Sequence, residues 1–214
     1  LPEGRFSIDI DDVTFSYRSR ADRALADDIV LERVTAFIPA GQQVAVVGAT
    51  GSGKTTLGRL VARFADPIAG EIRLGGVALS QIDNAELRRR LVVVAQEPFL
   101  FDDTVAENIR FSKPHATRDE IERIVDLLDV GDWVESLPDG LDTRVGERGD
   151  SLSAGERQLV ALLRAGVADP DVLVLDEATS SVDALTEVRI SRALSHLAAG
   201  RTTTGHVAAP AGHA

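Results

Sequence analysis

The sequence predicts an α/β fold with a three-layer core, an N-terminal antiparallel β portion and an inserted helical subdomain. Residues 48–56 form a glycine-rich loop between a short apolar run and a stretch with helical periodicity. A second apolar run, Val172–Leu175, ends in two carboxylates, and residues 103–166 between the two runs lose strand character. Buried strands that alternate with helices are typical of α/β folds.

The composition is that of a globular chain and argues against several classes of protein. The 214 residues are 44% hydrophobic and 27% charged, which is enough for a buried core. No apolar run reaches the roughly 18 residues of a membrane span, and no signal peptide is visible. The absence of cysteine excludes disulfides and thiolate metal sites and is compatible with a reducing cytosol. A net charge of −11 argues against a nucleic-acid partner. The polar start at Leu1 reads as the cut end of something longer.

The N-terminal region predicts two strands around a loop. Residues 6–15 alternate between apolar and polar, as a half-exposed strand does. Tyr17, the only tyrosine, follows, and its ring could stack on adenine; the alternative is an ordinary strand-edge residue. Residues 18–30 predict a charged loop, and residues 34–38 predict a strand that Pro39 ends.

Residues 48–56 satisfy the phosphate-loop pattern G-x-x-x-x-G-K-[ST]. The run 43–47 predicts a buried strand before the loop, and Leu57, Leu60, Val61 and Phe64 lie on one face of a helix after it. Loop amides and the helix dipole would therefore face an anion, with the Lys54 charge between phosphates and the Thr55 hydroxyl on Mg²⁺. We expect nucleotide contacts from Gly48, Thr50, Gly51, Ser52, Gly53, Lys54, Thr55 and Thr56.

The middle of the chain predicts a hairpin over residues 71–79 and then helices. Asp83 and Glu86 predict a helix start, and residues 91–95 predict a buried strand that ends at Gln96. Ligands gather at such strand ends in α/β sheets, although Gln96 also fits an ordinary loop residue. Thr117 and Glu120 predict a capping box for a helix with Ile121, Ile124, Val125 and Leu128 on one face.

Asp176 and Glu177 follow the apolar run Val172–Leu175. A carboxylate at the end of a strand beside the phosphate strand is placed to hold Mg²⁺, and the next can polarise a water. The alternative is a solvated acidic strand end. Asp183 predicts the cap of the next helix.

Residues 152–156, Leu-Ser-Ala-Gly-Glu, resemble the signature motif LSGGQ of ATP-binding-cassette (ABC) transporters, and they lie in the family's motif order. The resemblance to the family's nucleotide-binding domain covers residues 6 to about 203 and implies a P-loop NTPase core. Residues 144–149 resemble the X-loop of exporter-type members, and the run 96–109 points the same way.

The resemblance implies a role for each matched residue. Tyr17 would stack on adenine, Gln96 would touch Mg²⁺ and sense the membrane partner, and Asp176 would be the Walker B aspartate. Glu177 would be the catalytic glutamate, and residues 180–183 resemble the D-loop. In the family, two domains pair head to tail, so that Ser153 and Gly155 would close over the ATP of the other chain.

Two departures from the family pattern concern the signature and the end of the chain. Ala154 and Glu156 replace glycine and glutamine, and Glu156 would be tolerated if its side chain faced ribose or solvent. After Thr203 the chain is too short and glycine-rich for the buried strand of the family, so we expect an irregular or truncated tail. His206, two residues early, is then the candidate switch histidine, with His213 weaker.

Taken together, the sequence predicts Mg²⁺-dependent ATP binding and hydrolysis that powers an ABC exporter from the cytoplasmic face of the membrane. Lys54, Gln96, Glu177 and His206 would be catalytic, and Thr55, Gln96 and Asp176 would hold the metal. The expected parts are residues 1–95 (β portion and phosphate-loop half), 96–166 (helical subdomain) and 167–214 (second half of the core). A transmembrane domain and a second nucleotide-binding domain would be the partners.

Two other functions stay open. One is a regulatory subunit with weak hydrolysis in a heterodimeric transporter, which Glu156 and the tail favour and an intact Glu177 opposes. The other is a soluble non-transport ABC ATPase, which the lack of heptads and of a basic face disfavours. The sequence decides neither the substrate, nor an identical or different partner chain, nor the direction of transport.

Overall fold

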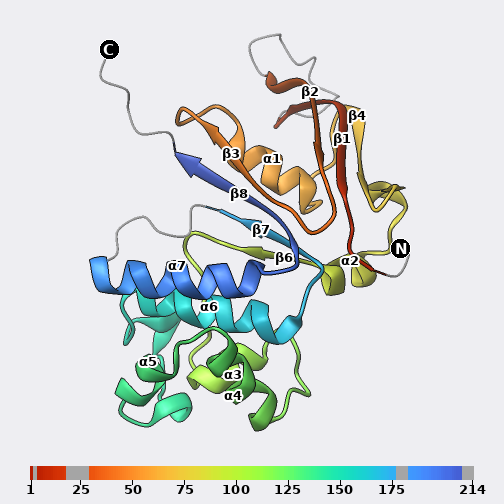
Figure 1. The fold of residues 1–214 in the computed structure, drawn as a ribbon. Coiled ribbons are helices and arrows are strands. Elements are labelled where there is room, and N and C mark those ends of the chain that lie inside the picture. The colour runs from red at the N-terminus through yellow and green to blue at the C-terminus, as the bar shows by residue number, and fades with distance from the viewer. Residues whose placement is uncertain (2–3, 18–28, 177–182, 209–214) are drawn as a thin grey trace. The chain divides into compact units, whose positions relative to one another are not determined.

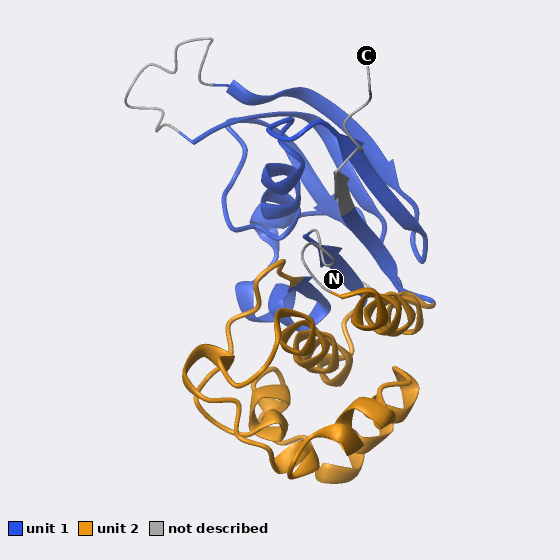
Figure 2. Ribbon diagram, turned by 90° about the vertical axis from the view of Figure 1, so that its left-hand side faces the viewer, with its two compact units in different colours: residues 1–93, 171–176, 200–214 blue, residues 94–170, 177–199 orange. Residues whose placement is uncertain are grey.

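The computed structural model describes residue 1 and residues 4–17, 29–176 and 183–208, without the side chains of residues 206–208. The chain divides into two compact units, shown in Figure 2. Unit 1 contains residues 1–93, 171–176 and 200–214, and unit 2 contains residues 94–170 and 177–199. Among the described residues, no helix has both the length and the apolar character that crossing a membrane requires.

Unit 1 contains an antiparallel sheet in which β1 is paired on both edges. Its four strands have the order β2-β1-β4-β5 and are β2 (Ile29–Ile38), β1 (Ile8–Ser16), β4 (Ala69–Leu74) and β5 (Val77–Ala78). Ile8 lies opposite both Ile38 of β2 and Leu74 of β4. The alternation of β1 buries Ile8, Ile10 and Phe15 in one core. The predicted strand 34–38 is the end of a longer one, because β2 pairs with β1 from Ile29 onward.

The second sheet is parallel and carries the phosphate strand at its edge. Its order is β3-β8-β7-β6, with β3 (Gln43–Gly48), β8 (Thr202–Ala208), β7 (Val172–Leu175) and β6 (Leu91–Val94). The carboxyl ends of β3 and β7, which flank β8, carry the phosphate loop and Asp176. Two distant parts of the sequence thus meet in one sheet (Figure 1).

Strand β8 corrects the expectation of an irregular tail after Thr203. The strand runs to Ala208 and pairs in parallel with β3 on one side and with β7 on the other. Pairing on both edges outweighs the weak propensity of Gly205, and three successive threonines, Thr202 to Thr204, favour the extended backbone. His213 lies outside the described residues.

Helix α1 (Lys54–Val61) connects the loop to the core of unit 1. It contacts β2 as well as the parallel strands β3, β7 and β8, and it buries Leu60 and Val61. The prediction that Phe64 lies on the face of this helix is wrong, because the helix is shorter. The helix ends at Val61 with Ala62 as its C-cap, Arg63 has a φ of 52°, and Phe64 is 60% exposed beneath the Arg88 guanidinium. The predicted helix start at Asp83 is confirmed, since its side chain caps α2 (Asn84–Arg90).

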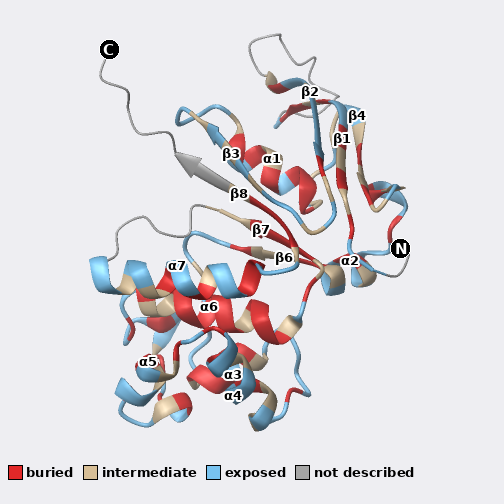
Figure 3. Cartoon of the chain, viewed as in Figure 1, coloured by how far each residue is buried: buried red, intermediate tan, exposed pale blue. Residues whose placement is uncertain are grey.

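Unit 2 is helical and is organised around one buried helix. Its helices are α3 (Val105–Arg110), α4 (Arg118–Leu127), α5 (Gly131–Ser136), α6 (Ala154–Ala168) and α7 (Ala184–Ala198). Helix α6 packs against α3, α4 and α7, and it is largely buried (Figure 3). The predicted capping box of Thr117 and Glu120 begins α4, and Asp183 caps α7. Capping satisfies backbone donors at the helix starts, which local sequence specifies.

Candidate nucleotide site

The phosphate loop curls around the side chain of its own lysine. Lys54 is buried, and its Nζ donates to the carbonyl oxygens of Gly48 (2.8 Å) and Ala49 (2.9 Å). These carbonyls belong to the last residue of β3 and to the residue after it, so the lysine closes a ring from the strand to the first residue of α1. The ammonium group is therefore held at the concave side of the loop, where an anion would meet it.

The glycines of the loop fit a tight approach of backbone to ligand. Gly51 and Gly53 have φ values of 83° and 86°, which residues with a side chain rarely adopt. A Cβ at Gly53 would lie 2.7 Å from Leu31 Cδ2, whereas one at Gly51 would meet nothing within 4 Å. Gly53 is thus required by packing and conformation together, and Gly51 by conformation alone.

Thr55 and Asp176 meet at the carboxyl edge of the parallel sheet. The Thr55 hydroxyl donates to Asp176 Oδ1 at 3.3 Å, although the residues are 121 positions apart. A hydroxyl and a carboxylate are hard oxygen donors, and Mg²⁺ in phosphate sites takes one or two such protein ligands besides water and phosphate. The described residues contain no group of three or more His, Cys, Asp or Glu side chains that could hold a metal. The pair therefore fits Mg²⁺ that arrives with a phosphate ligand.

Tyr17 is an exposed ring anchored beside the loop. Its hydroxyl lies 3.0 Å from Thr56 Oγ1, and its ring packs edge-on against Phe15 at 5.0 Å. The side chain is nevertheless 59% exposed. A ring that is fixed at both ends and keeps an open face can stack a base.

The signature segment begins α6, a largely buried helix of unit 2. Ser153 is the N-cap of α6, and its Oγ accepts from the Glu156 N–H at 3.2 Å. In return Glu156 Oε2 accepts from the Ser153 N–H at 2.8 Å, which completes a capping box. Gly155 is buried in the first turn, and Ser153 is exposed.

The chain matches the ABC transporter family over residues 31–180. The chain belongs to the ABC transporter family. It is 44% identical over 197 residues to ABC transporter B family member 19 of Arabidopsis thaliana, covering 92% of this chain and 15% of that protein. It is 41% identical to the ABC multidrug transporter mdr2 of Aspergillus fumigatus, covering 97% of this chain and 26% of that protein.

A solved structure of a bacterial Atm1-family ABC exporter with ATP bound has the same fold. The TM-score is 0.85 at 37% identity, over 97% of this chain and 35% of that one. The chain is thus an exporter-type ABC nucleotide-binding domain with the P-loop NTPase fold, and it spans well under half of each of these relatives.

The structure does not describe the side chains of Glu177 and His206, two expected site residues of this ABC domain. Glu177 lies outside the described residues, as do residues 180–182 of the D-loop-like segment. The backbone of His206 pairs with Val46, two residues before the end of the phosphate strand. The structure thereby brings the candidate switch histidine onto the strand beside the loop, a position that the glycine-rich tail did not predict.

Gln96 shares a cavity of unit 2 with the X-loop-like segment. The cavity has a volume of about 660 Å³, and its walls include Gln96, Phe99, Arg148 and Arg157. The backbone of the segment is tightly folded: Gly146 has a φ of 75°, and a Cβ there would lie 2.1 Å from Asp150 Oδ1. Gln96 and the X-loop-like segment are far apart in the sequence, and the fold places both at one cavity.

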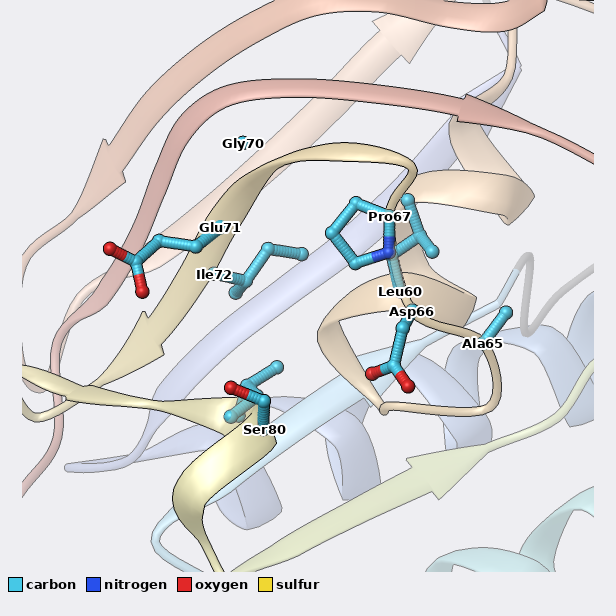
Figure 4. Close-up of a pocket in the computed structure, with 9 residues that line it drawn as sticks. Leu60, Ala65, Asp66, Pro67, Gly70, Glu71, Ile72 and Ser80 are labelled. Atoms are coloured by element: carbon cyan, nitrogen blue, oxygen red, sulfur yellow. The ribbon is translucent and has the colours of Figure 1, made fainter. Parts of the chain in front are cut away.

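A smaller cavity of about 260 Å³ opens in unit 1 at the C-terminal end of α1 (Figure 4). Its apolar wall includes Leu60 and Ile72, and its carboxylates are Asp66 and Glu71. Both carboxylates already have arginine partners: Arg63 is 3.6 Å from Asp66, and Arg73 contacts Glu71. We assign no ligand to this cavity, since its charges are satisfied by the protein.

Proposed function

We propose that this ABC domain binds ATP with Mg²⁺ and hydrolyses it to drive an exporter. The observation that carries the proposal is the meeting of Thr55 and Asp176 beside the Lys54 loop. Lys54 and the loop amides would stabilise the charge that develops on the transferred phosphoryl group. Tyr17 would hold the adenine ring, and Gly48, Thr50, Gly51, Ser52, Gly53 and Thr56 would complete the cradle.

Of the residues around the terminal phosphate, some would bind the metal and others would act on the attacking water. Thr55, Gln96 and Asp176 would hold Mg²⁺, which when bound neutralises phosphate charge. Glu177 would orient the attacking water and accept its proton, with His206 near the same phosphate as a further polar contact.

We further propose that two such domains pair head to tail. Ser153 and Gly155 lie at the start of a 15-residue helix, where backbone N–H groups and the dipole favour an anion. Pairing would set this helix start over the ATP of the other domain. It would also exclude water from the reacting phosphate.

The partner in the membrane would be a transmembrane domain of the same transporter, at the cytoplasmic face. A patch of exposed aromatic rings on unit 2 supports this: Phe99, Phe101 and Phe111 are 56%, 43% and 59% exposed. The rings contact each other, with centroids 5.1 and 4.6 Å apart. Clustered exposed rings mark surfaces that another protein covers.

Replacing Phe101 with Ser should leave ATP turnover of the free domain intact and reduce the coupling of ATP turnover to transport.

The test is the Mg²⁺-dependent ATPase rate per chain, measured against protein concentration. A rate that rises with concentration indicates paired domains, because each site needs two chains.

Glu177→Gln should keep ATP binding and stop turnover, and Lys54→Ala should weaken binding about tenfold or more through loss of the phosphate-binding charge. Unchanged turnover in Glu177→Gln would contradict the general-base role. Tight binding without turnover in the unaltered chain would favour the regulatory subunit.

A further inference from the structure

The carboxylate of Glu156 is held by two donors from its own unit. Its Oε2 accepts from the Ser153 N–H at 2.8 Å, and its Oε1 accepts from the Trp133 Nε1–H at 3.1 Å. Trp133 lies in α5 and is 2% exposed. The carboxylate that departs from the family pattern is therefore held between the indole and the Ser153 N–H.

The electrostatics agree with this geometry. Burial opposes ionisation of Glu156, but hydrogen bonds from the Ser153 backbone, the Trp133 indole and the Ser153 side chain outweigh it and hold the pKa of Glu156 below its ordinary value. The neighbouring Asp132 accepts from the Trp133 backbone N–H at 2.8 Å and from Arg189 of α7 at 2.6 Å. Trp133 is thus fixed at its backbone as well as by burial.

We propose that Trp133 is a positioning residue for the signature site and that it makes a glutamate workable at position 156. By holding the carboxylate against the Ser153 N–H, the indole fixes the first turn of α6 and the Ser153 side chain. The inference rests on the proposed function, because it concerns the same site.

The chemistry of the two side chains gives a sharp expectation. A carboxylate offers two acceptor oxygens to two donors, whereas an amide offers one oxygen and one NH₂ donor. In Glu156→Gln, either the Ser153 N–H or the indole N–H would face another donor. In Trp133→Phe, Glu156 Oε1 would lose its partner in a half-buried place. In the double variant one donor is gone, and the single amide oxygen can accept from the Ser153 N–H.

The experiment is a double-mutant cycle on turnover at saturating ATP and protein. Each single variant should lose about tenfold in turnover, and the double variant should recover to within about threefold of the unaltered chain. Affinity for a fluorescent ATP analogue, measured on the dilute chain, should change less than about twofold, because it depends on the phosphate loop of the same chain. Additive losses, or a Glu156→Gln variant as fast as the unaltered chain, would overturn the proposal.

The second capping box provides the matched control. Glu120→Gln changes the same kind of cap on α4 and should lower stability without lowering turnover. If Glu120→Gln lost as much turnover as Glu156→Gln, the loss in Glu156→Gln would be explained by lower helix stability alone, and the proposal would be overturned.

The single tryptophan separates this inference from the proposed function. If the unaltered chain has no turnover, the proposed function fails, but Trp133 fluorescence still reports its hydrogen bond to Glu156. The emission spectrum should differ between the unaltered chain and Glu156→Gln at neutral pH. Identical spectra would show that the indole and carboxylate do not interact, whatever the ATPase result.

Discussion

Single residues in this chain often carry two structural tasks at once. Lys54 closes the ring of the phosphate loop through the carbonyl oxygens of Gly48 and Ala49, and it is also the cation that a phosphate would meet. Glu156 ends a capping box and satisfies a buried indole. A substitution at such a position therefore changes stability and function together, and the two effects need separate measurements.

At the residue scale, the lowered pKa of Glu156 predicts a pH effect on stability. A carboxyl group whose folded pKa is depressed contributes stability above its ordinary pKa, here 4.5, and loses it as the pH falls through the folded value. The unaltered chain should therefore be more stable than Glu156→Gln near pH 6, and the difference should shrink as the pH falls below about 4.5. Urea unfolding between these pH values, followed by Trp133 fluorescence, measures it. A difference that does not vary with pH would contradict the assignment.

At the scale of one element, two of the three buried threonines of strand β8 have opposite environments. Thr202 Oγ1 donates to the Phe6 carbonyl and accepts from the Gly41 N–H, each at 2.7 Å. Thr203 Oγ1 is buried with no hydrogen-bond partner in the described part of the chain. The Thr202 hydroxyl therefore links β8 to Phe6 and Gly41 of unit 1, whereas the Thr203 hydroxyl makes no hydrogen bond to the described residues.

Replacement of each threonine by the isosteric valine should separate these cases. Thr202→Val leaves the buried Phe6 carbonyl and the partly buried Gly41 N–H without this partner, so it should lower the free energy of unfolding by about 2 kcal/mol. Thr203→Val removes an unsatisfied polar atom and should be neutral or stabilising by up to about 1 kcal/mol. Chemical denaturation of the two variants provides the comparison, and equal destabilisation would rule out this account of the strand.

The sequence predicted the elements whose signals are local. The caps at Asp83, Thr117 and Asp183 and the strand Val172–Leu175 are present as expected. Strand β8 was missed because its stability comes from neighbours far away in the chain, to which its own propensity adds little. The Trp133–Glu156 contact was missed for the same reason: 23 residues separate the partners, and no spacing rule relates them.

At the scale of the whole molecule, head-to-tail pairing predicts complementation between two inactive chains. A Lys54→Ala chain would keep its signature helix, and a Ser153→Ala chain would keep its phosphate loop. In a mixed dimer the intact loop of one meets the intact signature of the other, so one of the two sites works. Random pairing makes half of the dimers mixed, so an equimolar mixture should reach about a quarter of the unaltered rate per chain. The ATPase rate of the mixture measures this, and a mixture no faster than either variant alone would exclude shared sites.

The position of β8 has a consequence for how the protein is made. The phosphate strand β3 is hydrogen-bonded to β8, which a ribosome would deliver only after everything from α1 to α7. Until then β3 lacks this neighbour, and its open backbone groups are exposed to other chains. The nucleotide site can therefore take shape only late in synthesis, and a chaperone that shields β3 would act before the loop can bind its first ATP.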